Sequence, residues 1–153
     1  MLELPHTIIG ATIALKVGNP ALALPLALAS HFIVDMIPHW NPHLNREMME
    51  KGRLSDKTTY VVIVDVGLSL LAGFFIASQA LPNTGHFITV LAASFLAVAP
   101  DVIESPYYFF KKHYKIIEKF IDFQRSIQND ESPVVGLLTQ VLVVAAALWW
   151  VLK

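Results

Sequence analysis

The sequence predicts an all-α integral membrane protein in which residues 1–153 form a single domain. Hydrophobic residues make up 55% of the chain, which is more than the ~45–50% usual in soluble domains. The charged residues are also unevenly spread, since several long apolar segments contain almost none. We therefore expect about five hydrophobic helices: two helical hairpins with similar sequence patterns and a C-terminal span, joined by an amphipathic helix at the membrane interface.

The first predicted hairpin begins near the N-terminus. Its first helix covers residues 5–17, because Pro5 suits the first turn of a helix and an apolar run follows it. This run is shorter than the ~20 residues that a straight span needs, so we expect a short or partly immersed helix. After a turn at 18–20, a second helix covers residues 21–37. It ends before Pro38, which cannot continue the helical hydrogen bonds.

The second predicted hairpin repeats this pattern. Residues 60–81 form a clear membrane span in which Asp65 is the one charged residue, and a further helix covers 86–99 and ends at Pro100. Asp101 follows that proline as His39 follows Pro38 in the first hairpin. Each hairpin therefore has an ionisable residue near its start and another just after its final proline.

The last third of the chain predicts two further helices. Residues 107–128 combine aromatic and basic side chains at helical spacing. This pattern favours an amphipathic helix in the membrane interface, or a cytosolic helix that packs on its own protein. Residues 134–152 form the last span, in which Trp149 and Trp150 are placed as interface anchors.

The distribution of basic residues predicts the orientation in the membrane. Lysine and arginine concentrate in segments 41–59 and 107–131, while the turns at 18–20 and 82–86 contain none. The positive-inside rule then places the basic segments and the N-terminus in the cytoplasm and the C-terminus outside the cell membrane. The start of each hairpin and its end lie on the same side, so this topology gathers six candidate metal ligands near the cytoplasmic face: His6, His31, Asp35, His39, Asp65 and Asp101.

The segment from Ser30 to Trp40 carries the strongest indication of a site. His31, Asp35 and His39 follow one another at intervals of four residues at the end of an apolar helix. Residues four apart lie on one helix face, about 5–6 Å apart at Cβ. Two imidazoles and a carboxylate that converge in this way are typical of a metal site, although capping or hydrogen-bonded residues at a helix end are an alternative. The chain has no cysteine, so every ligand must be nitrogen or oxygen.

The other candidates also have structural interpretations. Asp65 fits a helix cap or a lysine partner, Asp101 fits an N-cap, and His6 fits an interface residue. Glu104 lies one turn after Asp101 and is our candidate general base. Gln140, alone in an apolar helix, is expected to hydrogen-bond to another helix.

Three motifs resemble a family of small bacterial and archaeal membrane proteins known as membrane-bound metal-dependent hydrolases. They are Pro5-His6-x-x-x-Gly10, the run Ser30-His31-Phe32-x-x-Asp35-x-x-Pro38-His39-Trp40, and Ala99-Pro100-Asp101. The resemblance implies a metal-assisted hydrolase. The ligands that it implies are His6, His31, Asp35, His39 and Asp101, with Asp65 less firmly included. Some relatives have a histidine in the amphipathic segment, whereas this chain has Phe123-Gln124-Arg125 there.

Together these observations favour a metal-dependent hydrolase at the cytoplasmic face of the membrane. One or two divalent ions, zinc or manganese, would activate water against an ester or phosphoester of an amphiphilic substrate, such as a phospholipid or a lipid-linked phosphate. Arg125 is the candidate residue for binding an anionic head group, although interface anchoring explains it equally well. The net charge of −1 indicates no nucleic-acid partner. The alternatives are a divalent-cation transporter or channel, and a structural membrane protein whose polar cluster locks helices together.

Overall fold

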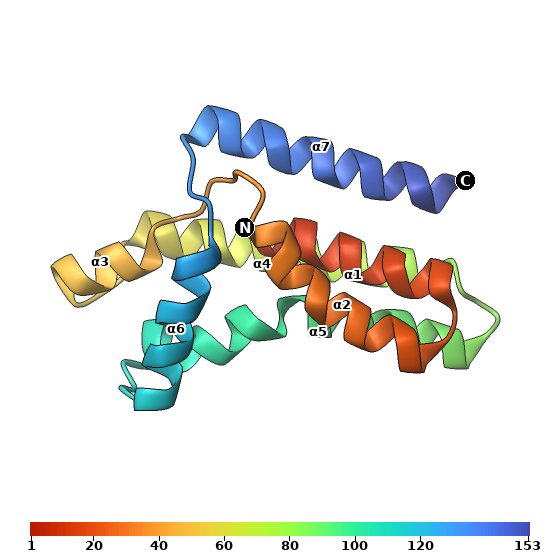
Figure 1. Ribbon diagram of the computed structural model, residues 1–153, viewed down its shortest axis with the longest axis horizontal. Helices are drawn as coiled ribbons and strands as arrows, with labels where there is room; N and C mark the ends of the chain where they lie inside the picture. The colour runs from red at the N-terminus through yellow and green to blue at the C-terminus, as the bar shows by residue number, and fades with distance from the viewer.

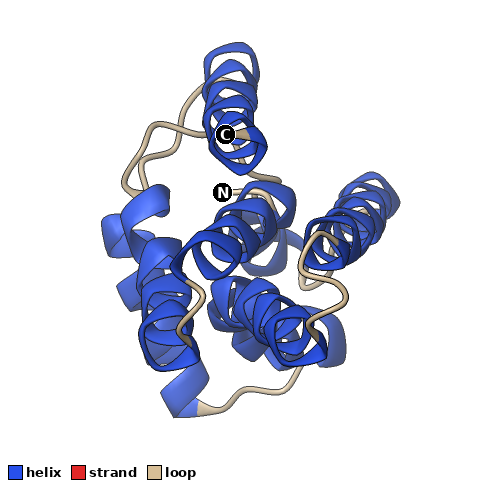
Figure 2. Ribbon diagram, turned by 90° about the vertical axis from the view of Figure 1, so that its right-hand side faces the viewer, coloured by secondary structure: helices blue, strands red, loops and turns tan.

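Seven helices joined by loops make up the computed structural model, which describes residues 1–153. Figure 2 shows that there is no sheet, so the predicted all-α class is confirmed. The helices are α1 (Glu3–Val17), α2 (Pro20–Asp35), α3 (Leu44–Lys51), α4 (Asp56–Ser78), α5 (Thr84–Phe110), α6 (Lys115–Ile127) and α7 (Pro133–Leu152).

Three of these helices are long and apolar enough to cross a membrane, namely α4, α5 and α7. The α2 helix is apolar but shorter, and α1 has only 15 residues. These lengths and compositions indicate a membrane protein with three candidate spans. The predicted number of five hydrophobic helices is not confirmed.

The α1 helix lies at the centre of the bundle and contacts α2, α4, α5 and α7. Figure 1 shows these five helices running in similar directions, with the α1–α2 and α4–α5 turns together at the right-hand end. The two segments rich in basic residues, which contain α3 and α6, lie at the opposite end. The bundle therefore has one basic end and one end without basic turns, as the hairpin topology predicts.

Small side chains allow the hairpin helices to pack closely. The buried core between them consists mainly of alanine, and only Ile8, Ile76 and Val90 are larger. Its alanines are Ala11, Ala14, Ala23, Ala27, Ala77, Ala80 and Ala93. Gly10 marks the closest approach of α1 to α5, because a Cβ at this position would lie 2.7 Å from the Ala93 carbonyl oxygen. Close backbone approach through small residues is typical of helix packing in membranes.

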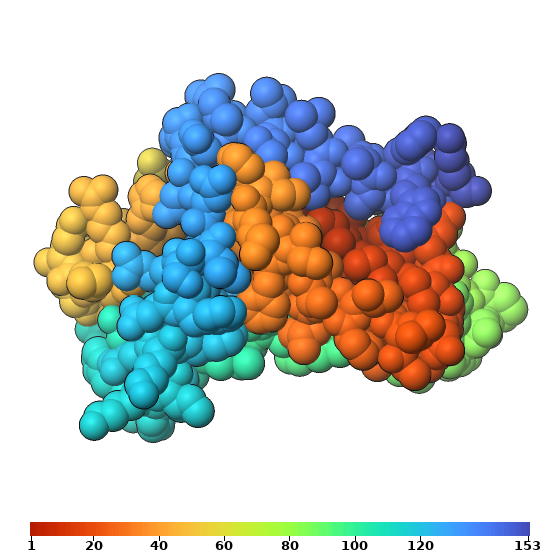
Figure 3. Space-filling view, viewed as in Figure 1, coloured from red at the N-terminus to blue at the C-terminus, as the bar shows by residue number.

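The outer faces of the spans are strongly apolar. Large hydrophobic side chains on α4 and α7 are exposed, including Ile63, Leu70, Leu71, Phe74, Phe75, Val134, Leu138, Val141 and Leu142. In the space-filling view α7 lies along one side of the body and leaves most of its own surface uncovered (Figure 3). Such faces suit contact with lipid acyl chains, since a soluble protein rarely exposes apolar patches of this extent.

The α5 helix differs from the prediction. It does not end at Pro100 but continues through Pro100 and Pro106 to Phe110. Proline within a helix is tolerated in membrane proteins because neighbouring groups satisfy the freed backbone atoms. Because α5 continues through Pro100, no helix begins at Asp101, and the N-cap interpretation of this residue is wrong. The Asp101 side chain projects from within α5.

Two smaller corrections concern the polar segments. The predicted helix over 107–128 is divided, since α5 ends at Phe110, Lys111 adopts a φ of 53°, and α6 begins only at Lys115. The α6 helix packs against α5 and α2, which agrees with the alternative that it covers its own protein. Segment 41–59 contains a short helix, α3, that the sequence did not predict; it ends at Gly52, with a φ of 65°.

Candidate metal centre

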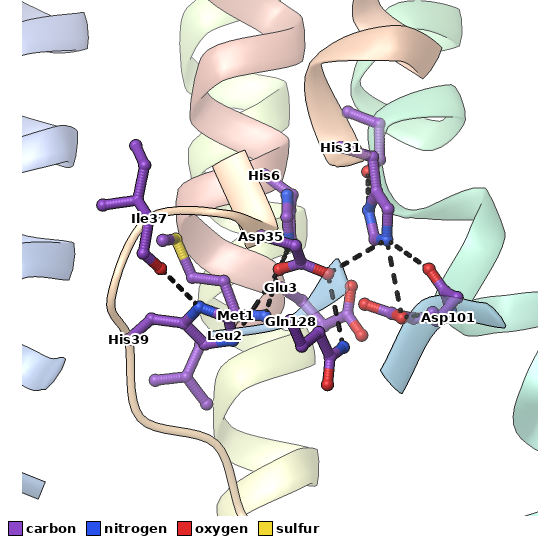
Figure 4. A network of polar contacts seen from close by, with 12 residues as sticks. Met1, Leu2, Glu3, His6, His31, Asp35, Ile37, His39, Asp101 and Gln128 are labelled. Atoms are coloured by element: carbon purple, nitrogen blue, oxygen red, sulfur yellow. Dashed lines mark hydrogen bonds and ion pairs between the residues drawn. The ribbon is translucent and has the colours of Figure 1, made fainter. Parts of the chain in front are cut away.

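Two buried histidines and one half-buried aspartate, from three helices, converge near the basic end of the bundle. His6 extends from α1, His31 from α2 and Asp101 from α5, and each offers one potential ligand atom within 4.8 Å of the others (Figure 4). The two imidazole rings are stacked, with centroids 4.2 Å apart. The predicted convergence of the two hairpins at this level is therefore present in the structure for His6, His31 and Asp101.

Asp35 lies beside this group and contacts all three predicted histidines. Its Oδ1 is 3.2 Å from His6 Nε2 and 3.8 Å from His39 Nε2, and its Oδ2 is 3.6 Å from His31 Nε2. The amino group of Met1 also contacts Asp35 Oδ1. Asp35 is completely buried, so the predicted spacing of four residues does bring both flanking histidines to one carboxylate.

Backbone carbonyls orient two of the histidine rings. His31 Nδ1 donates to the Ala97 carbonyl at 2.8 Å, and His39 Nδ1 donates to the Ile37 carbonyl at 2.8 Å. A carbonyl can only accept, so in both rings Nε2 remains to face the acidic cluster. Such a bond to one ring nitrogen commonly fixes the tautomer of a metal-binding histidine. Burial lowers the pKa of His39, which favours the neutral ring that a metal requires.

Several buried polar atoms of the cluster have no hydrogen-bond partner. They are both ring nitrogens of His6 and Nε2 of His39; the two Nε2 atoms approach Asp35 Oδ1 without forming a hydrogen bond to it. A buried polar atom without a partner costs about 1–3 kcal/mol, so such atoms in a folded protein need an explanation. A metal ion bound by these nitrogens and the neighbouring carboxylate oxygens would explain them. Imidazole nitrogen and carboxylate oxygen are ligands that suit zinc or manganese.

Asp65 has a different role from the ligand role that the sequence suggested. Its two carboxylate oxygens accept the backbone N–H groups of Glu3 and Leu4, at 2.6 and 3.1 Å. These amides lie at the N-terminus of α1, where N–H groups lack partners within the helix. Asp65 therefore caps α1 from the neighbouring helix α4, which agrees with the capping alternative, and it lies outside the three-residue group.

Gln124 is the central residue that sequence reasoning missed. Its side-chain amide donates to Asp101 Oδ1 at 3.1 Å and to Glu104 Oε1 at 2.6 Å, and its Oε1 lies 2.9 Å from His31 Nε2. The signal was present, because Gln124 falls at helical spacing after Ile117 and Ile121 and so belongs to the buried face of α6.

A cavity of about 470 Å³ opens beside the cluster. Asp101, Glu104 and Gln124 line one part of it, and Arg46 and Arg125 line another. The side-chain oxygen of Asn45 faces the guanidinium group of Arg125 and accepts two hydrogen bonds from it, at 2.8 and 3.1 Å. These bonds connect α3 to α6. The cavity thus joins the acidic, histidine-rich cluster to two arginine side chains.

The segment between α6 and α7 closes the cluster on another side. His39 donates its backbone N–H to the Asn129 carbonyl, and its own carbonyl accepts from Glu131. Gln140 accepts from the amide of Leu2, just before α1, and donates to the carbonyl of Trp40 in the loop after α2, so it bonds to segments beside two helices and not to the helices themselves. These bonds hold the loop after α2 and so fix the position of His39.

Comparisons of the chain with protein-family models, with curated proteins and with solved structures found no match. Its function is therefore inferred from the geometry of the buried polar groups and from the cavity beside them.

Proposed function

We propose that this cluster binds one or two divalent metal ions, zinc or manganese, and that the protein is a metal-dependent hydrolase at the membrane surface. The convergence of His6, His31 and Asp101, with ligand atoms within 4.8 Å of one another, carries the proposal. The unpartnered nitrogens of His6 and the position of Asp35 support it. The motifs that resemble membrane-bound metal-dependent hydrolases include all four of these residues.

Each residue of the cluster has a distinct part in the proposed reaction. His6, His31, Asp35 and Asp101 would hold the ion, which when bound lowers the pKa of a water molecule and polarises the scissile group. Glu104 lines the cavity beside Asp101 and is placed to accept the proton of the attacking water. Its carboxylate is held by the Gln124 amide at 2.6 Å.

The cavity supports an ester or phosphoester of an amphiphilic molecule as the substrate. Arg125 and Arg46 would bind an anionic head group, since guanidinium groups suit phosphate and carboxylate. The apolar outer faces of α4 and α7 support a site at a lipid boundary, where acyl chains would be available. We place the basic end of the bundle, and with it the cavity, on the cytoplasmic side.

The apolar core favours a hydrolase over a divalent-cation transporter or channel. The candidate ligands lie toward one end. Beyond them the buried core is mainly alanine, isoleucine and valine, and its buried polar side chains are hydroxyl groups such as those of Thr12 and Ser94. A permeant ion requires polar or water-filled surroundings across the membrane. A cluster that only locks helices together, the remaining alternative, predicts no metal dependence at all.

Replacing Glu104 by glutamine tests the hydrolase directly. We expect Glu104→Gln to keep its metal but to lose about 10²- to 10⁴-fold in the rate constant of hydrolysis, because it removes the proton acceptor. The measurement is release of phosphate or alcohol from phosphomonoester, phosphodiester and ester lipids in mixed micelles, with zinc or manganese present. Glu118→Gln, a partly exposed glutamate that pairs with His113, is the matched control. A metal-loaded wild type that hydrolyses none of these lipids would contradict the proposal.

A further inference from the structure

Gln124 is the one side chain of α6 that reaches the centre of the cluster. It is 1% exposed and makes three contacts with groups from α2 and α5. Its Nε2 lies 3.1 Å from Asp101 Oδ1 and 2.6 Å from Glu104 Oε1, while its Oε1 lies 2.9 Å from His31 Nε2. The amide therefore stands between the candidate base and the candidate ligands.

The contacts determine the orientation of the Gln124 amide. Two carboxylate oxygens face one end of the amide, and a carboxylate oxygen accepts hydrogen bonds. The NH₂ group must point toward Asp101 and Glu104, because the opposite orientation would set the amide oxygen against both. The carbonyl oxygen Oε1 consequently points at His31.

This orientation leaves two acceptor atoms facing each other. His31 uses Nδ1–H to donate to the Ala97 carbonyl, so in the neutral ring Nε2 carries a lone pair. The nearest oxygens to Nε2 are those of Gln124, Asp35 and Asp101, at 2.9, 3.6 and 3.7 Å. Only a cation near Nε2, a proton or a metal ion, makes such an arrangement of acceptors favourable.

We propose that Gln124 is itself a ligand of the metal ion, through Oε1, beside His31 Nε2. This inference rests on the proposed metal centre and adds a residue that neither the motifs nor the spacing assigns to it. Two atoms that each bind one ion at about 2.1 Å lie about 3 Å apart at the right angles of octahedral coordination and about 3.4 Å apart at tetrahedral angles. The 2.9 Å separation of Oε1 and Nε2 agrees with the octahedral value, which suits manganese.

The Gln124 amide would also couple the ion to the candidate base. Its carbonyl oxygen contacts the ion while its NH₂ group holds Asp101, a ligand, and Glu104, the proton acceptor. A single planar group thereby fixes the positions of three functional atoms. Because Gln124 lies on α6, metal binding would also hold α6 against α2 and α5.

The test compares two replacements at this position in the full-length protein purified in detergent. Gln124→Met keeps the size and removes both polar atoms, while Gln124→Glu keeps an oxygen at the ligand position. Gln79→Met is the control, because Gln79 is a hydrogen-bonded glutamine that follows α4 at the opposite end of the bundle. Dissociation constants for Zn²⁺ and Mn²⁺ are measured by titration in competition with a chromophoric chelator, and circular dichroism verifies folding.

We expect Gln124→Met to weaken metal binding by about 10- to 100-fold. Gln124→Glu should bind metal more tightly than Gln124→Met because it keeps a ligand oxygen, and Gln79→Met should stay within about threefold of the wild type. The Co²⁺ absorption spectrum should change in Gln124→Glu, since one ligand is replaced. Wild-type affinity in Gln124→Met, or equal losses in Gln124→Met and Gln124→Glu, would overturn the ligand role alone. A wild type that binds no metal would overturn the proposed function and this inference with it.

Discussion

The His31→Ala protein is expected to bind zinc or manganese at least about 100-fold more weakly than the wild type. His31 lies at the centre of the cluster, with oxygens of Gln124, Asp35 and Asp101 around its Nε2. Alanine removes one ligand and also the ring that the Ala97 carbonyl orients. The loss should exceed the about 10- to 100-fold that follows removal of a group that merely orients a ligand. Isothermal titration calorimetry in detergent measures the affinity.

His86→Ala is the matched control for this prediction. His86 is also a partly buried histidine whose ring bonds to a backbone carbonyl, that of Ala14, but it lies at the opposite end of the bundle. We expect it to bind metal as the wild type does. Equal affinity in His31→Ala and His86→Ala would show that metal binds elsewhere, and the cluster would then be a helix-locking structure.

The Gly10→Ala protein is expected to be less stable than the wild type by about 1–3 kcal/mol, the usual cost of overpacking. A Cβ at Gly10 would lie 2.5 Å from Ala97 Cβ and 2.7 Å from the Ala93 carbonyl oxygen. The second of these atoms belongs to the backbone of α5, so it cannot rotate away, and α1 must move. Thermal unfolding in detergent, followed by circular dichroism, measures the change.

Gly67→Ala separates this clash from the general effect of replacing glycine in a helix. Gly67 lies in α4, and a Cβ there meets no atom within 4 Å. Alanine favours a helix over glycine by roughly 0.5–1 kcal/mol, so Gly67→Ala should be as stable as the wild type or more stable. An unfolding temperature for Gly10→Ala equal to that of Gly67→Ala would contradict the close packing of α1 on α5.

The displacement of α1 should also affect the metal centre. Ala97 supplies the carbonyl that orients His31, and the same residue meets the added methyl group of Gly10→Ala. The packing at Gly10 and the orientation of the His31 ring thus share one turn of α5.

The apolar helices and part of the site could be predicted because their signals are local. Hydropathy located α4 and α7 to within a few residues, and the spacing of four residues placed His31 and His39 around Asp35. Hairpin topology alone brought His6 and Asp101 to the same level. For His31 and the hairpins these inferences depend on helix periodicity and on the direction of successive helices. His39 follows the end of α2 at Asp35, and backbone bonds to Asn129 and Glu131 hold it in place.

The features that sequence reasoning missed depend on partners far away in the chain. A helix cap was one interpretation of Asp65, but the sequence could not show which helix it caps, because the amides that it binds in α1 lie more than 60 residues earlier. Pro100 should end a helix by its local properties, yet packing against α1 and α2 keeps α5 helical on both sides of it. Gln124 became a site residue only when α6 folded onto α2 and α5.

Metal content of the wild-type protein tests the central claim most directly. The protein, purified in detergent, would be incubated with zinc, manganese and iron salts, separated from free ions by gel filtration and analysed by inductively coupled plasma mass spectrometry. The cluster of His6, His31, Asp35 and Asp101 predicts about one or two equivalents of a divalent metal. A wild type that stays metal-free under all three conditions would contradict the metal centre and identify the cluster as a structural network.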